Sequence, residues 1–556
     1  MKIGFKNISS NKRNFEINSE NYINDEEIFI VIDGKFDDNM TIQEIKEMYL
    51  KFGENIVNKI NGYFSTYIFD KQKDIVLLIK DRVGLKPIYY YEENNSIYCG
   101  NDLMNLVNTF NIKKIINTDA LSMYFRYHYI NPPQTIFKNI YKIKHGHYVI
   151  LKNNKKYDNV YWDVIEEFNN NSKKIEIDFN TSKNVLNDSI CRFVKDFVKK
   201  EDNYGIYISG GIDSSLVAAL CSKYSTRKIN TFSIGFYEEE YNEADKSRKI
   251  AEFLGTNHHE LYITKEKLLE TIKKISQYYS EPFSDSSELP TIILNEFAKE
   301  NNIKVALTGD GADQLFCGCP ICDTMWKCQN SYMLFNPFHL HISPFKLKNR
   351  KKLAYIFSNT DKKYQAQCDI LYNEMYLEGL FADDGQKRYE EEKIKSKNWQ
   401  ERRLILDFDN YACYRLTTKM GIAANKNNIE IRSPFYNKEL IEYSFKIPHK
   451  YKYYNRDKKY ILKQVLYKYI PKELFSNKKK GFGIPIQKWL KTYLYNDLKR
   501  LSSKEFIEKQ KIFNYGKIQS LIKDIDNKEI KHILWDFYIF QIWYEEYFLK
   551  ETKIKL

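Results

Sequence analysis

The clearest chemical signal in this sequence is a stretch of small and polar side chains, Ser209–Ser215, which reads Ser-Gly-Gly-Ile-Asp-Ser-Ser. A short apolar run, 204–208, precedes it, and a run rich in alanine and leucine, 216–221, follows it, as in a buried strand that turns into a helix. Two glycines allow a tight turn, and the free N–H groups at the start of a helix attract an anion. The serine hydroxyls add donors, and the carboxylate of Asp213 can hold a cation that bridges phosphates. The pattern therefore predicts a nucleotide-phosphate site rather than an ordinary glycine–serine turn.

No lysine follows the glycines, so this stretch is not the Walker motif. It resembles the pyrophosphate loop of the ATP pyrophosphatases, which release pyrophosphate and leave AMP on the substrate. Within that group it is most similar to asparagine synthetase and its relatives, whose loop reads S-G-G-x-D-S-S. The resemblance implies that this chain binds ATP.

Further motifs follow in the order of that family. Residues Thr231–Phe236 resemble the strand that flanks the adenine, Leu254–Glu260 matches L-G-T-x-H-H-E, and Glu281–Asp285 resembles the loop that leads to the third motif. The third motif, Leu307–Phe316, resembles L-S-G-(D/E)-G-x-D-E-L-F. The ATP-binding residues that the resemblance implies are Ile208, Ser209, Gly210, Gly211, Asp213, Ser214, Ser215, Ile234, Thr308 and Gly309.

Two carboxylates of the third motif, Asp310 and Asp313, stand three positions apart near the expected phosphate site. Mg²⁺ prefers oxygen ligands and keeps waters and phosphate oxygens, so Asp313 and Asp213 together predict a Mg²⁺ site. The resemblance implies that Asp310 faces the substrate and helps to form or use an acyl-adenylate.

The C-terminal half continues the match. Glu430–Phe435 resembles E-x-R-x-P-F, Lys458–Lys463 resembles G-K-x-x-L-R, and Lys479–Pro485 resembles K-x-G-F-x-x-P. The resemblance implies that Lys459 neutralises the phosphates and stabilises charge that develops during acyl transfer. On composition alone, in a chain this rich in lysine, Lys459 would pass for a solvated surface residue.

The N-terminal part resembles the N-terminal-nucleophile glutaminase domain that the family joins to its synthetase. Asn61–Tyr67 resembles N-G-x-F-A-x-x, Asp81–Tyr90 matches D-R-x-G-x-K-P-L-Y-Y, and residues 135–146 resemble the closing hairpin region. In that family the first residue after Met is a catalytic cysteine, but here it is Lys2, and the first cysteine is Cys99.

The glutamine-gripping segment is altered as well. The family's N-G-E-I-Y-N has become Asp33–Asp38, and a second glutamine-binding segment is missing between residues 38 and 53. A glutaminase of this kind needs a nucleophile that the free N-terminal amine activates, and Lys2 is not one. We therefore predict a retained glutaminase-like fold with no glutaminase nucleophile.

The chain of 556 residues exceeds what one hydrophobic core usually serves. We expect a degenerate glutaminase-like domain at 1–162, a polar linker at 163–178, and an asparagine-synthetase-like ATP pyrophosphatase domain at 179–556. The predicted fold class is α/β with α+β. An Ntn-hydrolase-like layered β-sandwich with helices comes first, and a doubly wound parallel sheet with a helical C-terminal part follows. The aromatic stretch 531–549 is expected to be core.

The net charge of +14 raises the question of a nucleic-acid partner. The lysines are scattered through every segment beside many Asn, Ile and Tyr residues, which is also the pattern that an AT-rich genome produces, so the charge does not predict such a partner. No apolar run approaches the length of a membrane span and no secretory signal opens the sequence. We expect a cytoplasmic protein with no membrane contact and leave a homodimer open.

Two groups of residues raise the question of another metal. Four cysteines cluster as C-x-C-x-x-C-x₅-C, which could bind Zn²⁺ but lacks paired C-x-x-C knuckles, and reduced thiols are the favoured reading; they are Cys317, Cys319, Cys322 and Cys328. The adjacent His258 and His259 should point apart in regular structure, which favours a structural role for both.

The expected activity is that of an ATP-dependent, AMP-forming amide ligase. It would adenylate a small-molecule or peptide carboxylate and transfer the acyl group to an amine or ammonia, without glutamine hydrolysis. Ammonia with aspartate would make the chain an ammonia-dependent asparagine synthetase. An amine in the same molecule would resemble β-lactam synthetase, and a peptide amine would resemble the lasso-peptide cyclases.

Three departures from the family pattern keep other functions open. Gln314 stands where the family has Glu, Lys463 where it has Arg, and Gly421 where it usually has Asp. These changes leave open a non-catalytic member of the family. An enzyme that adenylates RNA is also open, although the N-terminal domain belongs to the asparagine-synthetase arrangement and no RNA-binding module is recognisable.

Overall fold

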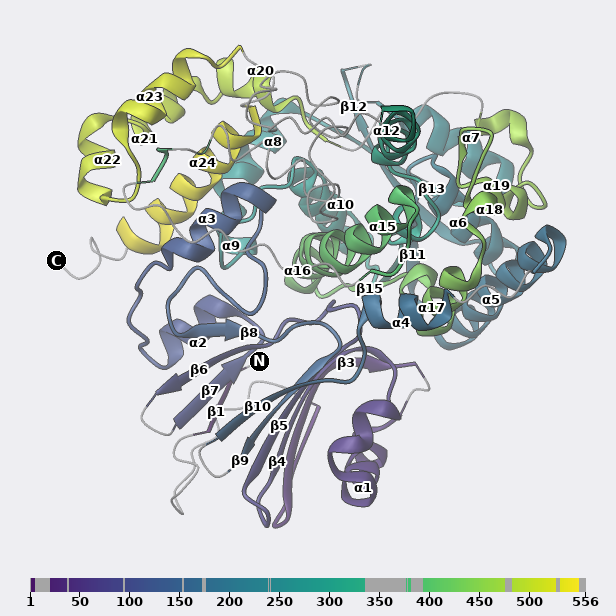
Figure 1. Ribbon diagram of the computed structural model, residues 1–556, viewed down its shortest axis with the longest axis horizontal. Coiled ribbons are helices and arrows are strands. Elements are labelled where there is room, and N and C mark those ends of the chain that lie inside the picture. The colour runs from purple at the N-terminus through teal and green to yellow at the C-terminus, as the bar shows by residue number, and fades with distance from the viewer. Residues whose placement is uncertain are drawn as a thin grey trace. The chain divides into compact units, whose positions relative to one another are not determined.

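The computed structural model of the chain describes residues 2–5, 21–37, 40–93, 96–152, 155–172, 177–238, 240, 242–335, 377, 379–381, 394–475, 483–526 and 531–549. Contacts divide the chain into two compact units (Figure 1). Unit 1 takes the residues up to Leu121, Ile130–Glu167 and Asn410–Ile422, and unit 2 takes Ser122–Tyr129, Phe168–Asp409 and the residues from Ala423 onward. The domain limits predicted at residues 162 and 179 stay predictions, and neither exchanged segment, Ser122–Tyr129 or Asn410–Ile422, was part of them.

Unit 1 holds two antiparallel sheets. The six-stranded sheet has the order β10-β9-β5-β4-β3-β2 and the four-stranded sheet has the order β1-β7-β6-β8. The strands are β1 (Lys2–Phe5), β2 (Tyr22–Asn24), β3 (Ile28–Phe36), β4 (Gly62–Asp70), β5 (Ile75–Lys80), β6 (Tyr89–Glu93), β7 (Ser96–Gly100), β8 (Ile140–Lys142), β9 (His147–Lys152) and β10 (Lys155–Val160).

Alternation along β3 shows why the sheets stack. Phe29 and Val31 face one core together with Tyr90 and Cys99 of the four-stranded sheet, so the two sheets pack face to face. Ile28, Ile30 and Ile32 point to the opposite face, where side chains of α1 (Ile42–Phe52) and η1 (Gly53–Asn58) cover them. The predicted layered β-sandwich with helices is confirmed.

Unit 2 is built on a five-stranded parallel sheet of order β13-β12-β11-β14-β15. Its strands are β11 (Tyr204–Tyr207), β12 (Asn230–Phe236), β13 (Asn257–Ile263), β14 (Val305–Leu307) and β15 (Glu430–Arg432). From β11 the chain proceeds outward to β13 and then returns on the other side of β11 to β14, which confirms the doubly wound topology. The crevice at such a switch point lies at the carboxyl ends of β11 and β14, where ligands bind in this architecture.

The remaining helices and short strands surround this sheet or precede it (Figure 1). Up to residue 335 they are α2 (Leu103–Thr109), α3 (Thr118–Tyr127), α4 (Val164–Asn171), α5 (Phe179–Lys200), α6 (Ile212–Tyr224), α7 (Ala244–Leu254), α8 (Lys265–Lys273), α9 (Ile275–Tyr278), α10 (Glu288–Glu300), α11 (Ala312–Leu315) and α12 (Ile321–Phe335). From residue 399 they are α15 (Trp399–Leu406), η4 (Asp407–Leu416), α16 (Thr417–Lys426), η5 (Pro434–Tyr436), α17 (Lys438–Lys446), α18 (His449–Lys452), β16 (Tyr453–Tyr454), β17 (Asp457–Lys458), α19 (Tyr460–Leu466), η6 (Lys472–Phe475), α20 (Ile486–Lys491), α21 (Tyr495–Leu501), α22 (Lys504–Gln510), α23 (Tyr515–Lys523), α24 (Lys531–Tyr544) and η7 (Glu545–Leu549).

Two expectations about helices have clear outcomes. Part of the predicted linker is helical as α4, which begins after Asp163, whose carboxylate accepts the Glu166 N–H at 2.7 Å. The aromatic residues of α24 are core as expected, since Trp535, Phe537, Phe540 and Trp543 are at most 1% exposed. None of the helices in the described ranges has both the length and the apolar character needed to cross a membrane.

Candidate active site

The turn between β11 and α6 has the backbone conformation that its glycines predict. Gly210 has a φ of +65°, a left-handed conformation that favours glycine. A Cβ on Gly210 would lie 2.7 Å from the Cβ of Lys246 and 3.1 Å from the backbone nitrogen of Ser247, so α7 leaves no room for a side chain. The Ser247 hydroxyl in turn donates to the Ile208 carbonyl at 3.2 Å. The loop is therefore fixed from both sides, with Gly211 as the N-cap of α6.

The serines of the loop divide their roles. Ser214 Oγ accepts a hydrogen bond from the Ser209 N–H at 3.1 Å and lies 3.1 Å from Ser209 Oγ, which closes the turn. Ser215 is fully buried, and its hydroxyl has no hydrogen-bond partner in the described part of the chain. An unsatisfied buried hydroxyl costs about 1–3 kcal/mol. Because Ser215 lies in the first turn of α6, beside the free N–H groups, the site fits a phosphate group that would satisfy it.

The centre of the site is an ion-paired lysine. Lys459 Nζ contacts Asp213 Oδ2 from the loop and Asp313 Oδ1 from α11, and the lysine side chain is only 8% exposed. Burial alone would lower the pKa of Lys459, but the two carboxylates outweigh it and raise the pKa. The group is therefore a fixed positive charge next to the predicted phosphate site. Asp213, Asp313 and Lys459, which are widely separated in the sequence, meet here.

The backbone that carries Lys459 is unusual. Tyr453 pairs with Lys458 and Tyr454 with Asp457, so β16 and β17 form a hairpin whose two-residue turn has positive φ at both positions. Lys459 follows directly, with a φ of 57° and a ψ of 30°, as the N-cap of α19. A lysine in this conformation stores strain, and such strain persists only where the surroundings hold it.

Close backbone packing brings the third motif against the loop. A Cβ on Gly309 would lie 2.7 Å from Asp213 Cβ and 2.8 Å from the Ser214 backbone nitrogen. The Thr308 N–H donates to the Arg432 carbonyl at 2.9 Å, and the Ser433 hydroxyl donates to the Asp310 carbonyl at 2.7 Å. The E-x-R-x-P-F segment thus anchors the backbone of the third motif.

Three of the predicted residues contribute in other ways. Ile208 and Ile234 are buried at the ends of β11 and β12, where the Ile208 N–H donates to the Phe232 carbonyl at 2.9 Å. The Asp310 side chain is half-buried and is not part of the Lys459 ion pairs. Its role toward a substrate stays a prediction.

Sequence reasoning missed one residue of the site, Gly318. A Cβ there would overlap both the Asp313 carboxylate and the end of the Lys459 side chain, so only glycine leaves room for this ion pair. The signal in the sequence is a glycine that stands between two cysteines just after the third motif. Lys246 and Ser247, which pack on Gly210, lie outside the quoted motifs and carried no signal.

The donor set decides which cations fit. Asp213 and Asp313 offer carboxylate oxygens, and Mg²⁺ is commonly bound through one or two carboxylates together with substrate phosphates. The residues present therefore fit Mg²⁺ bound with ATP. Within the described ranges, no group of three or more His, Cys, Asp and Glu residues is arranged to hold a metal ion without phosphates.

The cysteine cluster does not form a Zn²⁺ site. Cys317 and Cys322 pack with Leu404 and Tyr453, whereas Cys328 packs in a separate cluster with Met325 and Trp399. Burial raises the pKa of Cys319 well above its usual value, and a hydrogen bond with Cys317, followed by burial, does the same for Cys322. Zn²⁺ binds thiolates, so these protonated thiols favour the alternative that reduced thiols line the loop.

The paired histidines lie on opposite faces of β13, as the period of a strand requires. The two ring nitrogens of His258 lie 2.9 Å from Thr231 Oγ1 and 3.1 Å from Ser233 Oγ. His259 stacks on Phe232 with the ring centroids 4.7 Å apart. Both residues have structural contacts, and burial lowers the pKa of both.

This burial predicts a pH dependence of stability. The pKa of His258 is lowered below 6.5 in the folded chain, so the unfolded chain takes up the proton first as the pH falls. Stability is therefore greatest above pH 6.5 and is lost as the pH falls toward the folded-state pKa. The substitution His258→Gln should make the free energy of unfolding less dependent on pH, by at most about 1.4 kcal/mol per pH unit. Urea unfolding between about pH 5 and pH 8 measures this, and an unchanged slope would contradict it.

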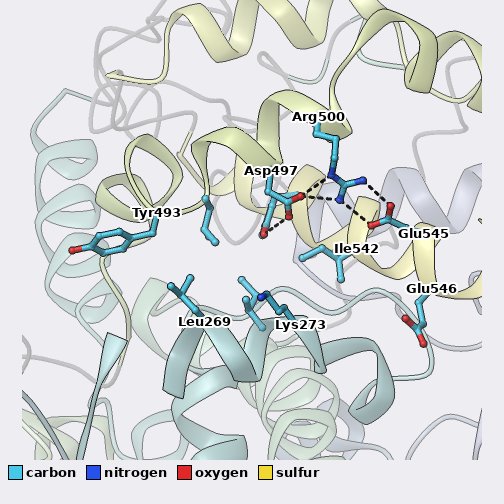
Figure 2. Close-up of a pocket in the computed structure, with 11 residues that line it drawn as sticks. Leu269, Lys273, Tyr493, Asp497, Arg500, Ile542, Glu545 and Glu546 are labelled. Carbon is cyan, nitrogen blue, oxygen red and sulfur yellow. Dashed lines mark hydrogen bonds and ion pairs between the residues drawn. The ribbon is translucent and has the colours of Figure 1, made fainter. Parts of the chain in front are cut away.

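A separate cavity of about 460 Å³ lies among α8, α21, α24 and η7 (Figure 2). Arg500 extends into it and pairs with Asp497 at 2.7 Å and with Glu545 at 2.7 Å. Tyr538 donates to the second oxygen of Asp497 at 2.9 Å. These charged groups bond to one another, and no predicted site residue lines the cavity.

Comparison with known proteins identifies the family. A family model described as asparagine synthase matches residues 186–545, which is more than half of the chain. The chain belongs to the asparagine synthase family. A second model, described as a glutamine amidotransferase domain, matches residues 34–162. Membership of the asparagine synthase family places the chain among the carbon–nitrogen ligases that use ATP.

Individual relatives are distant. A protein of Methanocaldococcus jannaschii with the provisional name asparagine synthetase [glutamine-hydrolyzing] 2 is 34% identical over 49% of this chain and 53% of its own length. The chain thus spans about half the length of this relative. Asparagine synthetase [glutamine-hydrolyzing] 1 of Bacillus subtilis is 23% identical, over 89% of this chain and 79% of its own length. A protein of Gibberella zeae named amidase chry2 is 22% identical, over 89% of this chain and 80% of its own length.

Proposed function

We propose that the chain joins a carboxylate to an amine or ammonia in two steps at this site. In the first step a carboxylate oxygen attacks the α-phosphorus of ATP, the bond to the β-phosphate breaks, and pyrophosphate leaves. In the second step the amine nitrogen attacks the acyl carbon, AMP leaves with the former carboxylate oxygen, and the nitrogen loses a proton. The observation that carries this proposal is the buried Lys459 ammonium, held between Asp213 of the loop and Asp313 of the third motif.

Each group of the site has a part in this scheme. The N–H groups at the start of α6 and the unsatisfied Ser215 hydroxyl bind the leaving pyrophosphate. Lys459 supplies a fixed positive charge for the oxygens that gain negative charge. Asp213 and Asp313 would hold Mg²⁺, which when bound neutralises phosphate charge. Asp310, whose backbone Ser433 anchors, is proposed to face the acyl substrate.

We also propose that unit 1 does not hydrolyse glutamine. Asp33, in the segment where the family grips glutamine, forms an ion pair with Lys86 at 3.2 Å and accepts a hydrogen bond from Asn101 at 2.6 Å. Burial alone would raise the pKa of Asp33, but Lys86 and Asn101 outweigh it and lower the pKa. The backbone of Lys2 pairs with Gly100, next to Asn101, so the residue in the nucleophile's position is a lysine in β1. These contacts use within the protein the carboxylate that would otherwise meet a ligand.

The test is ATP–pyrophosphate exchange by the purified chain with Mg²⁺, using aspartate, other amino acids and carboxylate-bearing peptides as acyl substrates. We expect exchange with one acid, and amide formation with ammonia or an amine but not with glutamine. Exchange with aspartate that ammonia completes to asparagine would establish the ammonia-dependent asparagine synthetase. Release of glutamate from glutamine would disprove the second proposal, and ATP binding without exchange for any acid would disprove the first.

A further inference from the structure

One carboxylate holds together the hairpin that carries Lys459. Asp323 Oδ1 accepts a hydrogen bond from the Tyr453 hydroxyl at 2.8 Å, and Asp323 Oδ2 forms an ion pair with Lys458 Nζ at 2.8 Å. Tyr453 and Lys458 are directly opposite each other in the β16–β17 pair. The two oxygens of Asp323 thus bind both members of one cross-strand pair, immediately before Lys459.

Helix α12, which carries Asp323, contacts the hairpin at two further points. The Arg456 guanidinium at the tip of the turn lies 4.7 Å from the centre of the Trp326 ring. The Tyr453 ring packs with Cys317 and Cys322 in the segment that joins α11 to α12. That segment also contains Gly318, which lies against the Asp313–Lys459 ion pair. Helix α12 is therefore connected to Lys459 through the hairpin and through the loop that follows Asp313.

We infer that Asp323 is a positioning residue that acts on the reaction through Lys459; this inference rests on the role proposed above for Lys459. Lys459 has a left-handed backbone that is strained for a side chain, so its conformation must be held by its neighbours. Directly before it in the sequence, Asp323 holds the tip-side residues of the hairpin to α12. Without this carboxylate the hairpin can relax, and the ammonium no longer has one fixed position between Asp213 and Asp313.

The substitution Asp323→Ala should weaken Mg·ATP binding and lower ATP–pyrophosphate exchange by about 10- to 100-fold, because a shift of about 1 Å at a reacting charge has an effect of this size. Tyr453→Phe removes one of the two contacts and should have a smaller effect. Tyr451→Phe is the matched control, since the Tyr451 hydroxyl donates only to the backbone carbonyl of Ile177, at 3.3 Å. Asp323→Glu, which restores a carboxylate, should recover part of the loss.

A double-mutant cycle separates positioning from general destabilisation. If Asp323 acts through Lys459, Asp323→Ala will have no further effect on Mg·ATP affinity in a Lys459→Ala background. An equal effect of Asp323→Ala in both backgrounds would overturn the inference, as would wild-type affinity in Asp323→Ala, and so would an unchanged affinity in Lys459→Ala. The thermal midpoint of each variant shows that the folded chain is being compared. Affinity is measured without an acyl substrate, so a chain that exchanges with no acid would disprove the proposed function while the cycle still decides the role of Asp323.

Discussion

Replacing Lys459 with alanine will lower ATP–pyrophosphate exchange by about 10²- to 10³-fold, the effect of removing one preorganised group that stabilises transition-state charge. The lysine is 8% exposed and its ammonium contacts two carboxylates, so no other side chain can replace it by a change of rotamer. Its loss also leaves Asp213 and Asp313 facing each other without the intervening positive charge. Each carboxylate then disfavours ionisation of the other, which weakens both as ligands for a cation.

The control for this prediction is a lysine that forms an exposed ion pair. Lys504 lies 3.8 Å from Glu508, and both side chains are more than half exposed, so Lys504→Ala should leave exchange unchanged. Lys459→Arg keeps the charge but must fit a larger planar group beside Gly318, and it should restore only a small part of the rate. Exchange at the wild-type rate in Lys459→Ala would exclude this ammonium from the chemistry.

The sequence predicted those parts of the site that depend on neighbouring residues. The loop at Ser209–Ser215 lies between an apolar strand and a helix, and its glycine conformation and hydroxyl positions follow from that context. The parallel sheet could be predicted in the same way, because its strands are short apolar runs followed by turns. The meeting of Asp213, Asp313 and Lys459 depended on the family resemblance, since no local pattern relates residues so far apart in the chain.

The sequence did not predict contacts between segments that carry no shared motif. Asp323 and Lys458 are 135 positions apart, and neither belongs to a pattern that predicts a partner. Short segments such as Ser122–Tyr129 and Asn410–Ile422 leave their chain neighbours for the other unit, which a division into consecutive ranges does not capture. The cysteine spacing was ambiguous because a spacing does not reveal which side chains lie together, and the structure separates Cys328 from Cys317 and Cys322.

Replacing Gly309 with alanine should weaken ATP binding strongly and destabilise the fold. The added methyl group would lie 2.7 Å from Asp213 Cβ and 2.8 Å from the Ser214 backbone nitrogen, so the backbone at the start of α6 must move. Overpacking of this kind typically costs about 1–3 kcal/mol of stability. The displaced groups are those proposed to bind phosphate, so the loss of ATP affinity should exceed what the loss of stability alone would cause. Gly516→Ala is the matched control, because the nearest atom to its new Cβ is Asn514 Oδ1 at an ordinary 3.4 Å, within helix α23. Denaturant unfolding and ATP titration of both variants measure the two effects. Normal ATP affinity in Gly309→Ala would mean that the contact between the third motif and the loop does not shape the phosphate site.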